Sequence, residues 1–316
     1  MDTLPEPIDW PPRWSPEWVS RRAVIEQARR ERLHSREPAP GGLPPAPYRI
    51  FAAALRAAGL YQRGYRNFLD LGLTRIRHCP SPWPRSLDGL RILHLSDLHL
   101  DLDPALVPVT CSRIAGVPFD LAVLTGDFWD ISLAEEGKTL AGLQAILAAL
   151  GNPPLGVHAV LGNHDTLQLA AGLETLGLGL LINEAVLLGD GDSRFALAGI
   201  DDAYAFGTGS VKAAARACPP GLPRILLSHS PQVAEAAREA GFCLMLSGHT
   251  HGGQICLPGG LPLVTMTEIP APLFRGLWRA GPLAGYTSTG AGACHLPLRF
   301  NCPPEIVLHS LHALPG

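Results

Sequence analysis

The chain has 316 residues, of which 47% are hydrophobic, and a formal net charge of −3. A chain of this length can bury one large core and form roughly one to two domains, and its near-neutral charge argues against a protein coated with basic residues for nucleic acid. The 34 glycines and 31 prolines are spread along the sequence, which indicates many tight turns between short elements rather than disorder.

Charge is distributed unevenly between the first 85 residues and the rest. Residues 1–85 hold 14 arginines and 8 acidic residues, a net +6, whereas the remainder holds 11 basic and 20 acidic residues, a net −9. We therefore divide the chain into an arginine-rich, partly helical extension (1–85) and a larger acidic domain (86–316). The basic charge of residues 1–85 has two interpretations. It binds an anionic partner or surface, or it belongs to a helix whose arginines are simply solvated.

Two segments of the extension have helical patterns. A Ser-Pro-Glu sequence at residues 15–17 is typical of a helix start, and this helix is expected to run to about Arg36. After a break rich in proline and glycine, residues 48–77 interleave aromatic residues and leucines with arginines in a basic amphipathic pattern. This segment either makes a peripheral contact with an anionic membrane or packs on the protein or on a second subunit, and its three glycines favour packing.

The cysteines and apolar stretches bear on the compartment. The 7 cysteines include no Cys-x-x-Cys pair, and six lie among apolar or small residues typical of buried thiols, which favours a reducing compartment. No N-terminal stretch has the apolar core of an export signal, and no apolar stretch reaches the roughly 20 residues that span a bilayer. We expect a cytoplasmic protein that is either soluble or peripherally attached to the inner face of the membrane. The sequence does not define its oligomeric state.

From residue 87 onward, short apolar runs alternate with longer helical stretches. Strands are expected at 90–95, 121–125, 156–161, 180–188, 195–200, 224–227 and 244–246, and helices at 134–150, 166–176, 210–217 and 232–240. Residues 254–312 are punctuated by glycine and proline and indicate β structure, with short runs at 261–265, 286–289 and 305–308. This order predicts an α/β layered sandwich with functional loops at its strand ends.

Five short motifs follow these apolar runs and carry seven oxygen and nitrogen donors. They are SDLH, TGDFWD, LGNHD, SHSP and SGHTHGG, with the donors Asp97, His99, Asp127, Asn163, His229, His249 and His251. Because strand ends meet at one rim of a sheet, these side chains are expected to share a site. Two divalent ions about 3.5–4 Å apart can share one carboxylate and clamp the attacking and leaving oxygens of a phosphate ester. A donor set without thiolate favours Mn, Fe, Zn or Mg over copper.

The five motifs, in this order, resemble those of the calcineurin-like metallophosphoesterase superfamily over about 91–308. The resemblance implies an α/β fold, a four-layer αββα sandwich, with residues 86–316 as the catalytic domain and residues 1–85 as an extension outside it. It also implies the ligands of two metal ions, of which manganese is the first choice. The first ion would be held by Asp97, His99 and His251, the second by Asn163, His229 and His249, and Asp127 would bridge the two.

The same resemblance implies two catalytic residues that do not bind metal. His164 would face the phosphate and protonate the leaving oxygen or stabilise the transition state, and Asp130 would set the protonation of His164. A hydroxide bridging the metals would attack phosphorus in line, while the metals take up charge on the phosphoryl oxygens. His295 and Arg299, after a glycine-rich segment, are further candidates for a phosphate contact.

The residues that flank the motifs narrow the range of expected substrates. SHSP, GHTHGGQ and PLRFNCPPEIVL are similar to a bacterial branch that includes phosphodiesterases, phosphatases and UDP-2,3-diacylglucosamine pyrophosphohydrolases of lipid A synthesis, although Gln232 stands where an acid is common. The leading hypothesis is hydrolysis of a phosphodiester or pyrophosphate bond in a lipid-linked nucleotide. A general, nucleic-acid or cyclic-nucleotide phosphodiesterase and a non-catalytic metal-binding scaffold are the alternatives. The acidic body disfavours nucleic acid, and the complete ligand set disfavours a scaffold.

The remaining histidines are expected to be structural. His94 and His158 lie within apolar strands and are assigned to the core. The other four are assigned to the surface: His34, His78, His309 and His312.

Overall fold

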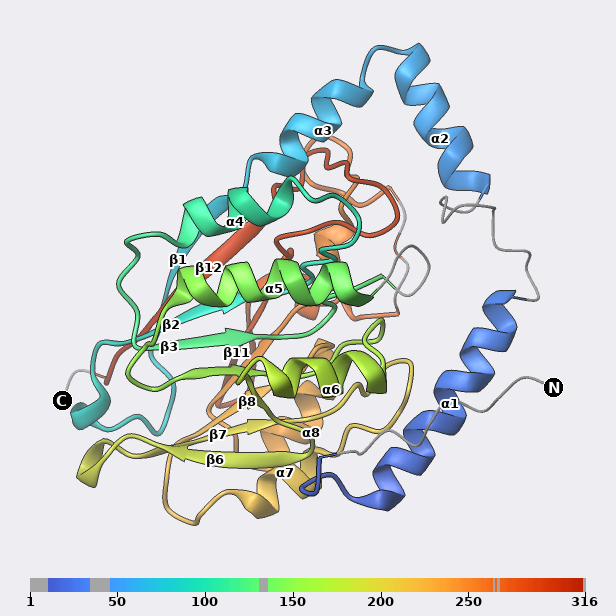
Figure 1. Cartoon of the computed structure of the whole chain (residues 1–316). Coiled ribbons are helices and arrows are strands. Elements are labelled where there is room, and N and C mark those ends of the chain that lie inside the picture. Colours follow the sequence, from blue (N-terminus) through green and yellow to red (C-terminus); the bar gives the residue numbers. More distant parts are fainter. Residues whose placement is uncertain (1–10, 35–45, 131–135, 264, 266–267, 315–316) are drawn as a thin grey trace.

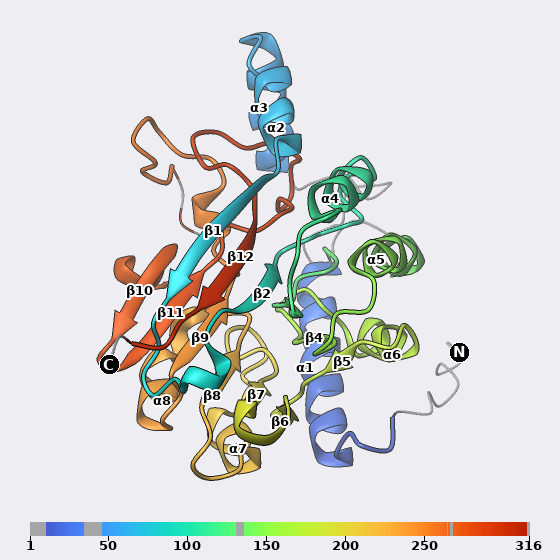
Figure 2. The same ribbon diagram turned by 90° about the vertical axis from the view of Figure 1, so that its left-hand side faces the viewer.

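The computed structural model describes residues 11–34, 46–130, 136–263, 265 and 268–314. Two six-stranded sheets face each other and are enclosed by helices (Figures 1 and 2). None of the helices in the part of the chain that the structure describes combines the length and apolar character needed to cross a membrane.

The first sheet has the strand order β1-β12-β2-β3-β4-β5. Its strands are β1 (Gly72–His78), β2 (Leu90–Leu95), β3 (Leu121–Leu124), β4 (Val157–Ala159), β5 (Gly179–Leu180) and β12 (Glu305–Leu311). Strands β2 to β5 are parallel, whereas β12 runs antiparallel to β2 and parallel to β1. The carboxyl ends of β2, β3 and β4 therefore lie on the same side of this sheet.

The second sheet has the order β10-β11-β9-β8-β7-β6. Its strands are β6 (Glu184–Leu188), β7 (Phe195–Gly199), β8 (Arg224–Leu227), β9 (Leu244–Ser247), β10 (Gly276–Ala280) and β11 (Leu283–Thr287). The four central strands are parallel and the two edge strands are antiparallel to their neighbours. Both sheets thus present several strand ends to one rim.

Helices cover the outer face of each sheet. Helices α4 (Leu106–Ile114), α5 (Glu136–Leu150) and α6 (Leu167–Thr175) pack on the first sheet, and α7 (Val211–Ala217) and α8 (Ala234–Glu239) on the second. Figure 2 shows α4, α5 and α6 stacked on one side of the sheets. The two sheets share an apolar core that includes Ile92, Val123, Leu197 and Leu246. The predicted four-layer αββα sandwich is confirmed.

The sequence of β2 shows why these strands are apolar without alternation. Ile92 belongs to the core between the sheets, whereas Leu93 and Leu95 belong to the core under α4 and α5. A strand that is covered on both faces needs apolar residues on both.

In its described residues, 11–34 and 46–85, the extension contains three α-helices and one strand. Helix α1 (Pro16–His34) contacts α6, and α2 (Ala46–Ala57) and α3 (Tyr61–Leu69) form an arm at one end of the molecule in Figures 1 and 2. Strand β1 pairs with β12 along its whole length. Residues 48–77 are therefore two helices and a strand rather than one amphipathic segment, and the first sheet takes strands from both sides of residue 85.

Two further expectations differ from the structure. The apolar run 180–188 forms two strands, β5 and β6, which lie in different sheets because the chain changes direction at Asn183, whose φ is +57°. Helix α4 was not expected, since the run Leu106–Ile114 contains Pro108 and polar residues.

Two of the four histidines assigned to the surface are buried. His78 of β1 and His309 of β12 join His94 of β2 in a row between the sheets: His78 Nε2 lies 2.9 Å from His309 Nδ1, and His309 Nε2 lies 3.3 Å from His94 Nδ1. His94 Nε2 continues the row to Thr125 Oγ1 at 2.8 Å. The pairing of distant strands buries these residues, which their sequence neighbours do not reveal. His34 is in α1, and the structure describes nothing of its side chain.

Candidate metal centre and active site

The seven predicted metal ligands converge on one rim of the sandwich. They occupy the loops that directly follow β2, β3, β4, β8 and β9, and all seven are buried. Strands from both sheets contribute, so the site lies where the two sheets open at their carboxyl ends. The motifs are brought together by the topology in the way that their positions after the strands predicted.

The donor atoms form two groups that share one residue. In the first, ligand atoms of Asp97, His99, Asp127 and His251 all lie within 4.8 Å of one another. In the second, Asp127, His229 and His249 meet the same limit. Asn163 joins the second group, because its Oδ1 lies 3.0 Å from His229 Nε2.

Asp127 has the position of a bridging ligand. Its Oδ2 lies 3.6 Å from His99 Nε2 in one group and 3.2 Å from His229 Nε2 in the other. Carboxylate, imidazole and amide donors without thiolate suit divalent Mn, Fe, Zn or Mg. Two divalent ions therefore fit the residues present, and Asp127 would belong to the ligand set of both.

The backbone of the site is held in an uncommon conformation. Asp97, His99, Asp127, His249 and His251 all have positive φ, between 40° and 74°. Such residues cost on the order of 1–3 kcal/mol each and persist where the surrounding structure fixes them, as it does at functional sites. The strain falls on five of the seven predicted ligands, which supports the assignment of this rim as the functional site.

Two glycines permit the close approach of the ligand loops. A Cβ atom on Gly162, just before Asn163, would lie 2.2 Å from Asp127 Oδ1, and one on Gly248, just before His249, would lie 2.2 Å from Asp97 Oδ2. These positions tolerate no side chain, so the glycines of GNHD and GHTH have a steric reason.

Asp165 is a supporting residue that the sequence reasoning missed. Its carboxylate accepts hydrogen bonds from the backbone N–H groups of Asp127 at 2.8 Å, Phe128 at 2.9 Å and Gly162 at 2.7 Å. It therefore ties the loop after β3 to the loop after β4. The only sequence signal was its place as the last residue of the GNHD motif.

The extension also supports this loop. Arg22 of α1 is fully buried and forms an ion pair with Asp201, and it donates a hydrogen bond of 2.7 Å to the carbonyl oxygen of Asp165. Its guanidinium stacks over the ring of Phe206 at 3.4 Å. Helix α1 is thus attached to the back of the GNHD loop rather than being a solvated helix.

Hydrogen bonds orient the ligands from behind. His229 Nδ1 lies 2.7 Å from the carbonyl oxygen of Thr125, which fixes the proton on Nδ1 and leaves Nε2 free to bind a metal. The backbone N–H of His249 donates to both carboxylate oxygens of Asp97, at 3.0 and 3.1 Å.

Burial and charge set the ionisation of the ligands. Burial lowers the pKa of His99 to about 4 and that of His249 to about 3, so both are neutral, the form that binds metal. Burial also opposes a charge on His229, but the adjacent Asp127 outweighs it and raises the pKa of His229 to about 10. Burial raises the pKa of Asp97 to about 6. A cation between these carboxylates and imidazoles would favour the ionised acids and the neutral bases.

The predicted catalytic pair lies beside the metal ligands. His164 Nδ1 is 3.4 Å from Asp130 Oδ1, and the ring of His164 lies edge-on to His99 with centroids 5.1 Å apart. Burial opposes protonation of His164, but Asp127 and Asp130 together raise its pKa well above the usual value. Asp130 Oδ2 also lies 3.6 Å from Nδ1 of His295, so this carboxylate stands between two imidazoles.

His295 and Arg299 have different surroundings. His295 lines the cavity described below, so its predicted contact with a substrate is sterically open. Arg299 is fully buried, and its guanidinium donates to the carbonyl oxygens of Thr289 at 2.7 Å and Gly292 at 2.5 Å. Its place is therefore inside the loop that supports Asp97, and the predicted phosphate contact is wrong for Arg299.

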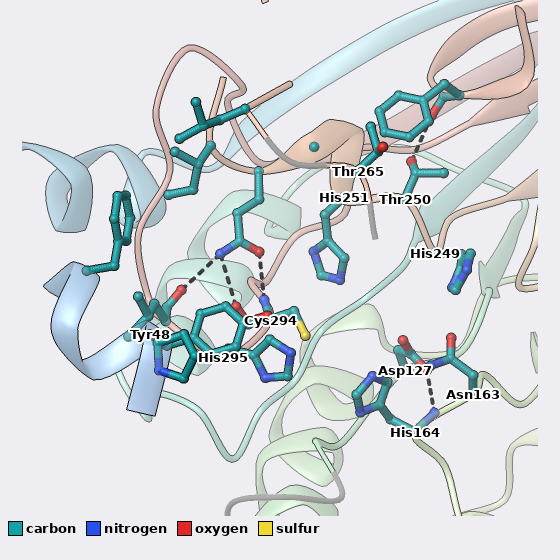
Figure 3. A pocket seen from close by; sticks show the side chains of 18 of the residues that line it. Tyr48, Asp127, Asn163, His164, His249, Thr250, His251, Thr265, Cys294 and His295 are labelled. Atoms are coloured by element: carbon teal, nitrogen blue, oxygen red, sulfur yellow. Dashed lines mark hydrogen bonds between the residues drawn. The ribbon is translucent and has the colours of Figure 1, made fainter. Parts of the chain in front are cut away.

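One cavity of about 470 Å³ joins the metal centre to the arm formed by α2 and α3. On one side it is lined by Asp127, Asn163, His164, His249 and His251. Figure 3 shows these polar side chains together, with Tyr48 and His295 side by side across the cavity, their ring centroids 4.3 Å apart. The wall nearer the arm is largely apolar and includes Tyr48, Phe51, Ile255, Leu263 and Leu296, whereas Phe274 lies beside Thr250, between two of the metal ligands. This wall was not foreseen from the sequence.

Comparison with known proteins agrees with this geometry. The family model of the calcineurin-like phosphoesterases matches residues 90–253, which contain all seven ligands and His164. The chain belongs to this family. Members of this family use divalent metals, and the chain is accordingly a metal-dependent hydrolase that acts on phosphoester bonds.

Several curated proteins are similar to most of the chain. The uncharacterised metallophosphoesterase YkuE of Bacillus subtilis is 31% identical over 284 residues, which cover 83% of this chain and 93% of YkuE. The phosphodiesterase YaeI of Escherichia coli is 30% identical over 261 residues, which cover 78% of this chain and 92% of YaeI. The crystal structure of TT1561 of Thermus thermophilus aligns at a TM-score of 0.41 and 14% identity, covering 64% of this chain and 90% of TT1561.

Proposed function

We propose that the protein hydrolyses a phosphodiester or pyrophosphate bond at a two-metal centre, in a substrate that carries an apolar group beside that bond. The observation that carries this proposal is a cavity with two unlike walls. One wall holds the complete ligand set and His164, and the other presents aromatic and aliphatic side chains. A lipid-linked nucleotide such as UDP-2,3-diacylglucosamine combines both features, and manganese is the proposed metal.

Different residues hold the metal ions and orient the ligands. When bound, two divalent ions neutralise phosphoryl charge and lower the pKa of water. Asp127 fixes the spacing of the two ligand groups, since its Oδ2 faces both. Thr125 and the N–H of His249 hold His229 and Asp97 in place before any substrate arrives.

His164 is the proposed general acid. Its raised pKa keeps the imidazole protonated near neutral pH, and it lines the cavity, where a leaving oxygen can reach it. Proton donation from its ring to that oxygen, as the phosphorus–oxygen bond breaks, avoids the release of an alkoxide. Asp130, 3.4 Å away, stabilises the imidazolium before transfer.

The apolar wall supports a substrate with two different ends. A phosphomonoester has one organic substituent, its leaving group, whereas a diester or pyrophosphate has a second substituent that can lie against Phe51 and Leu296. The similarity to YaeI, which is named a phosphodiesterase, favours the same bond type.

The test is hydrolysis by manganese-reconstituted protein of three classes of substrate: nucleotide-lipids, soluble phosphodiesters such as bis(4-nitrophenyl) phosphate and cyclic nucleotides, and phosphomonoesters. We expect metal-dependent turnover of diesters, with the highest kcat/KM for the nucleotide-lipids, whose acyl groups can lie on the apolar wall. Turnover confined to soluble cyclic nucleotides would contradict the apolar substrate, and no metal-dependent turnover of any substrate would contradict the enzyme.

A further inference from the structure

We propose that the open end of the cavity docks on an anionic lipid bilayer. The docking surface consists of Ile50 on α2 and Leu257, Leu261 and Leu263 on the loop 254–263, and we call it the apolar rim. This inference extends the proposed function, since it says where a substrate with an apolar group is met. It stands on the surface itself and not on the chemistry of the metal centre.

The apolar rim exposes large hydrophobic side chains from two distant parts of the chain. Ile50 is 70% exposed, Leu257 47%, Leu261 64% and Leu263 51%. Single exposed leucines are normal in soluble proteins, but a group of them at one opening indicates an interaction site. Residues about 200 positions apart in the sequence contribute to the same group.

The rim is continuous with the cavity. Ile50 lies one helical turn after Pro47, which lines the cavity, and Leu263 both lines the cavity and reaches solvent. The two segments pack together at their bases, where Phe51 and Ile255 belong to one apolar cluster with Leu296. An apolar group held at the rim would therefore be next to the apolar lining of the cavity.

The loop presents its leucines on a folded tip. The N–H of Leu257 donates to the carbonyl oxygen of Leu261 at 2.8 Å, and the N–H of Leu263 donates to that of Ile255 at 2.9 Å. These hydrogen bonds close the segment on itself, while Leu257, Leu261 and Leu263 remain exposed. This is the arrangement that insertion into the headgroup region of a bilayer requires.

Charge distinguishes a lipid surface from other partners. Residues 46–69 contain Arg49, Arg56, Arg63 and Arg66, all exposed, and no acidic residue, whereas residues 254–263 contain no charge. The chain as a whole has a net charge of −3, so this end is basic on an acidic molecule. Arginines around apolar tips match anionic headgroups above an acyl layer. A nucleic acid would use the arginines but not the leucines.

The test is co-sedimentation of the full, metal-loaded protein with vesicles of phosphatidylcholine alone and of phosphatidylcholine mixed with phosphatidylglycerol. We expect binding to the mixed vesicles at low salt, weaker binding at high salt, and little binding to the neutral vesicles. A double variant, Ile50→Glu with Leu261→Glu, should bind the mixed vesicles at least about tenfold more weakly.

Matched controls separate docking from folding and from chemistry. Val24→Glu and Leu277→Glu change residues that are 69% and 57% exposed outside the rim, and they should sediment like wild type. The double variant should hydrolyse bis(4-nitrophenyl) phosphate in solution at the wild-type rate, which also shows that it is folded.

Three results would overturn the docking surface. The wild-type protein could stay in the supernatant with anionic vesicles, or the double variant could bind them as tightly as wild type. The two control variants could also lose as much vesicle binding as the double variant. Protein that binds vesicles through the rim but hydrolyses no phosphodiester would instead retain the docking surface and remove the proposed function.

Discussion

The two walls of the cavity differ in how they are built. The metal wall comes from loops that directly follow strands of both sheets; its seven ligands are buried, five of them have positive φ, and hydrogen bonds orient His229 and Asp97. The apolar wall comes from α2 and from loops between residues 255 and 296, and parts of it are exposed. The fold thus supplies a rigid reaction centre common to the family, whereas peripheral segments of this chain shape the space for the substrate.

The largest effect is expected on the metal wall, at the residue shared by both ligand groups. Asp127→Asn removes the carboxylate charge between His99 and His229 while nearly keeping the shape. We expect kcat for a soluble diester to fall about a thousandfold, or about 4 kcal/mol, together with a loss of bound metal. Steady-state kinetics and metal analysis measure both. Asp192→Asn at an exposed position is the control, and full metal content with full activity in Asp127→Asn would contradict the bridging role.

The next effect separates proton donation from metal binding. His164→Ala should lower kcat by about 10²-fold for a diester with an alkyl leaving group, because the leaving oxygen then departs without a proton. The loss should be smaller for a 4-nitrophenyl ester, whose leaving group needs no protonation. Metal content should be unchanged, and His312→Ala should behave like wild type. An equal loss for both leaving groups would argue that His164 is not the acid.

A smaller effect is expected at Asp130, which acts through His164. Asp130→Asn removes a negative charge 3.4 Å from His164 Nδ1, which lowers the pKa of the imidazole. The protonated form is then lost at a lower pH, so the alkaline limb of the kcat/KM profile should move to lower pH. A shift of roughly one pKa unit lowers the rate about tenfold at a given pH on the alkaline limb, whereas the rate near neutral pH should change less. An alkaline limb that moves to higher pH or stays in place would exclude this role for Asp130.

The smallest effect is expected on the apolar wall, and it should depend on the substrate. Phe51→Ala removes a ring from the wall and should raise KM about tenfold for a substrate with an acyl or aryl group, from about 1–3 kcal/mol of lost burial. kcat should be nearly unchanged, as should both constants for a small soluble diester. Ala53→Ser on the exposed face of α2 is the control. An equal change for both substrates would indicate damage to the metal wall instead.

The metal wall was accessible from the sequence because each part of it is local. Each strand is recognisable in the sequence as an apolar run, and a metal ligand follows it within a few residues, as Asp97 follows β2 and His229 follows β8. The parallel topology then brings such ends together. The resemblance to the family added the assignment of each donor to one ion, which spacing alone does not give.

The remaining features depend on contacts between distant segments. His78 is flanked by Arg77 and Cys79 and gives no sign of burial, which arises only when β1 pairs with β12. Arg299 resembled a phosphate ligand by residue type, but carbonyl oxygens from residues 289–292 enclose its guanidinium. The apolar wall consists of ordinary aromatic and aliphatic residues, whose placement opposite His164 follows from where α2 packs on residues 296–300.

The number of metal ions bound per chain tests the central claim most directly. The metal-free protein would be titrated with manganese, and bound metal and phosphodiester hydrolysis would be measured on the same samples. We predict two ions per chain, with turnover appearing as the second site fills and disappearing with a chelator. One ion or none at saturation, or turnover that persists without metal, would contradict the two-metal centre.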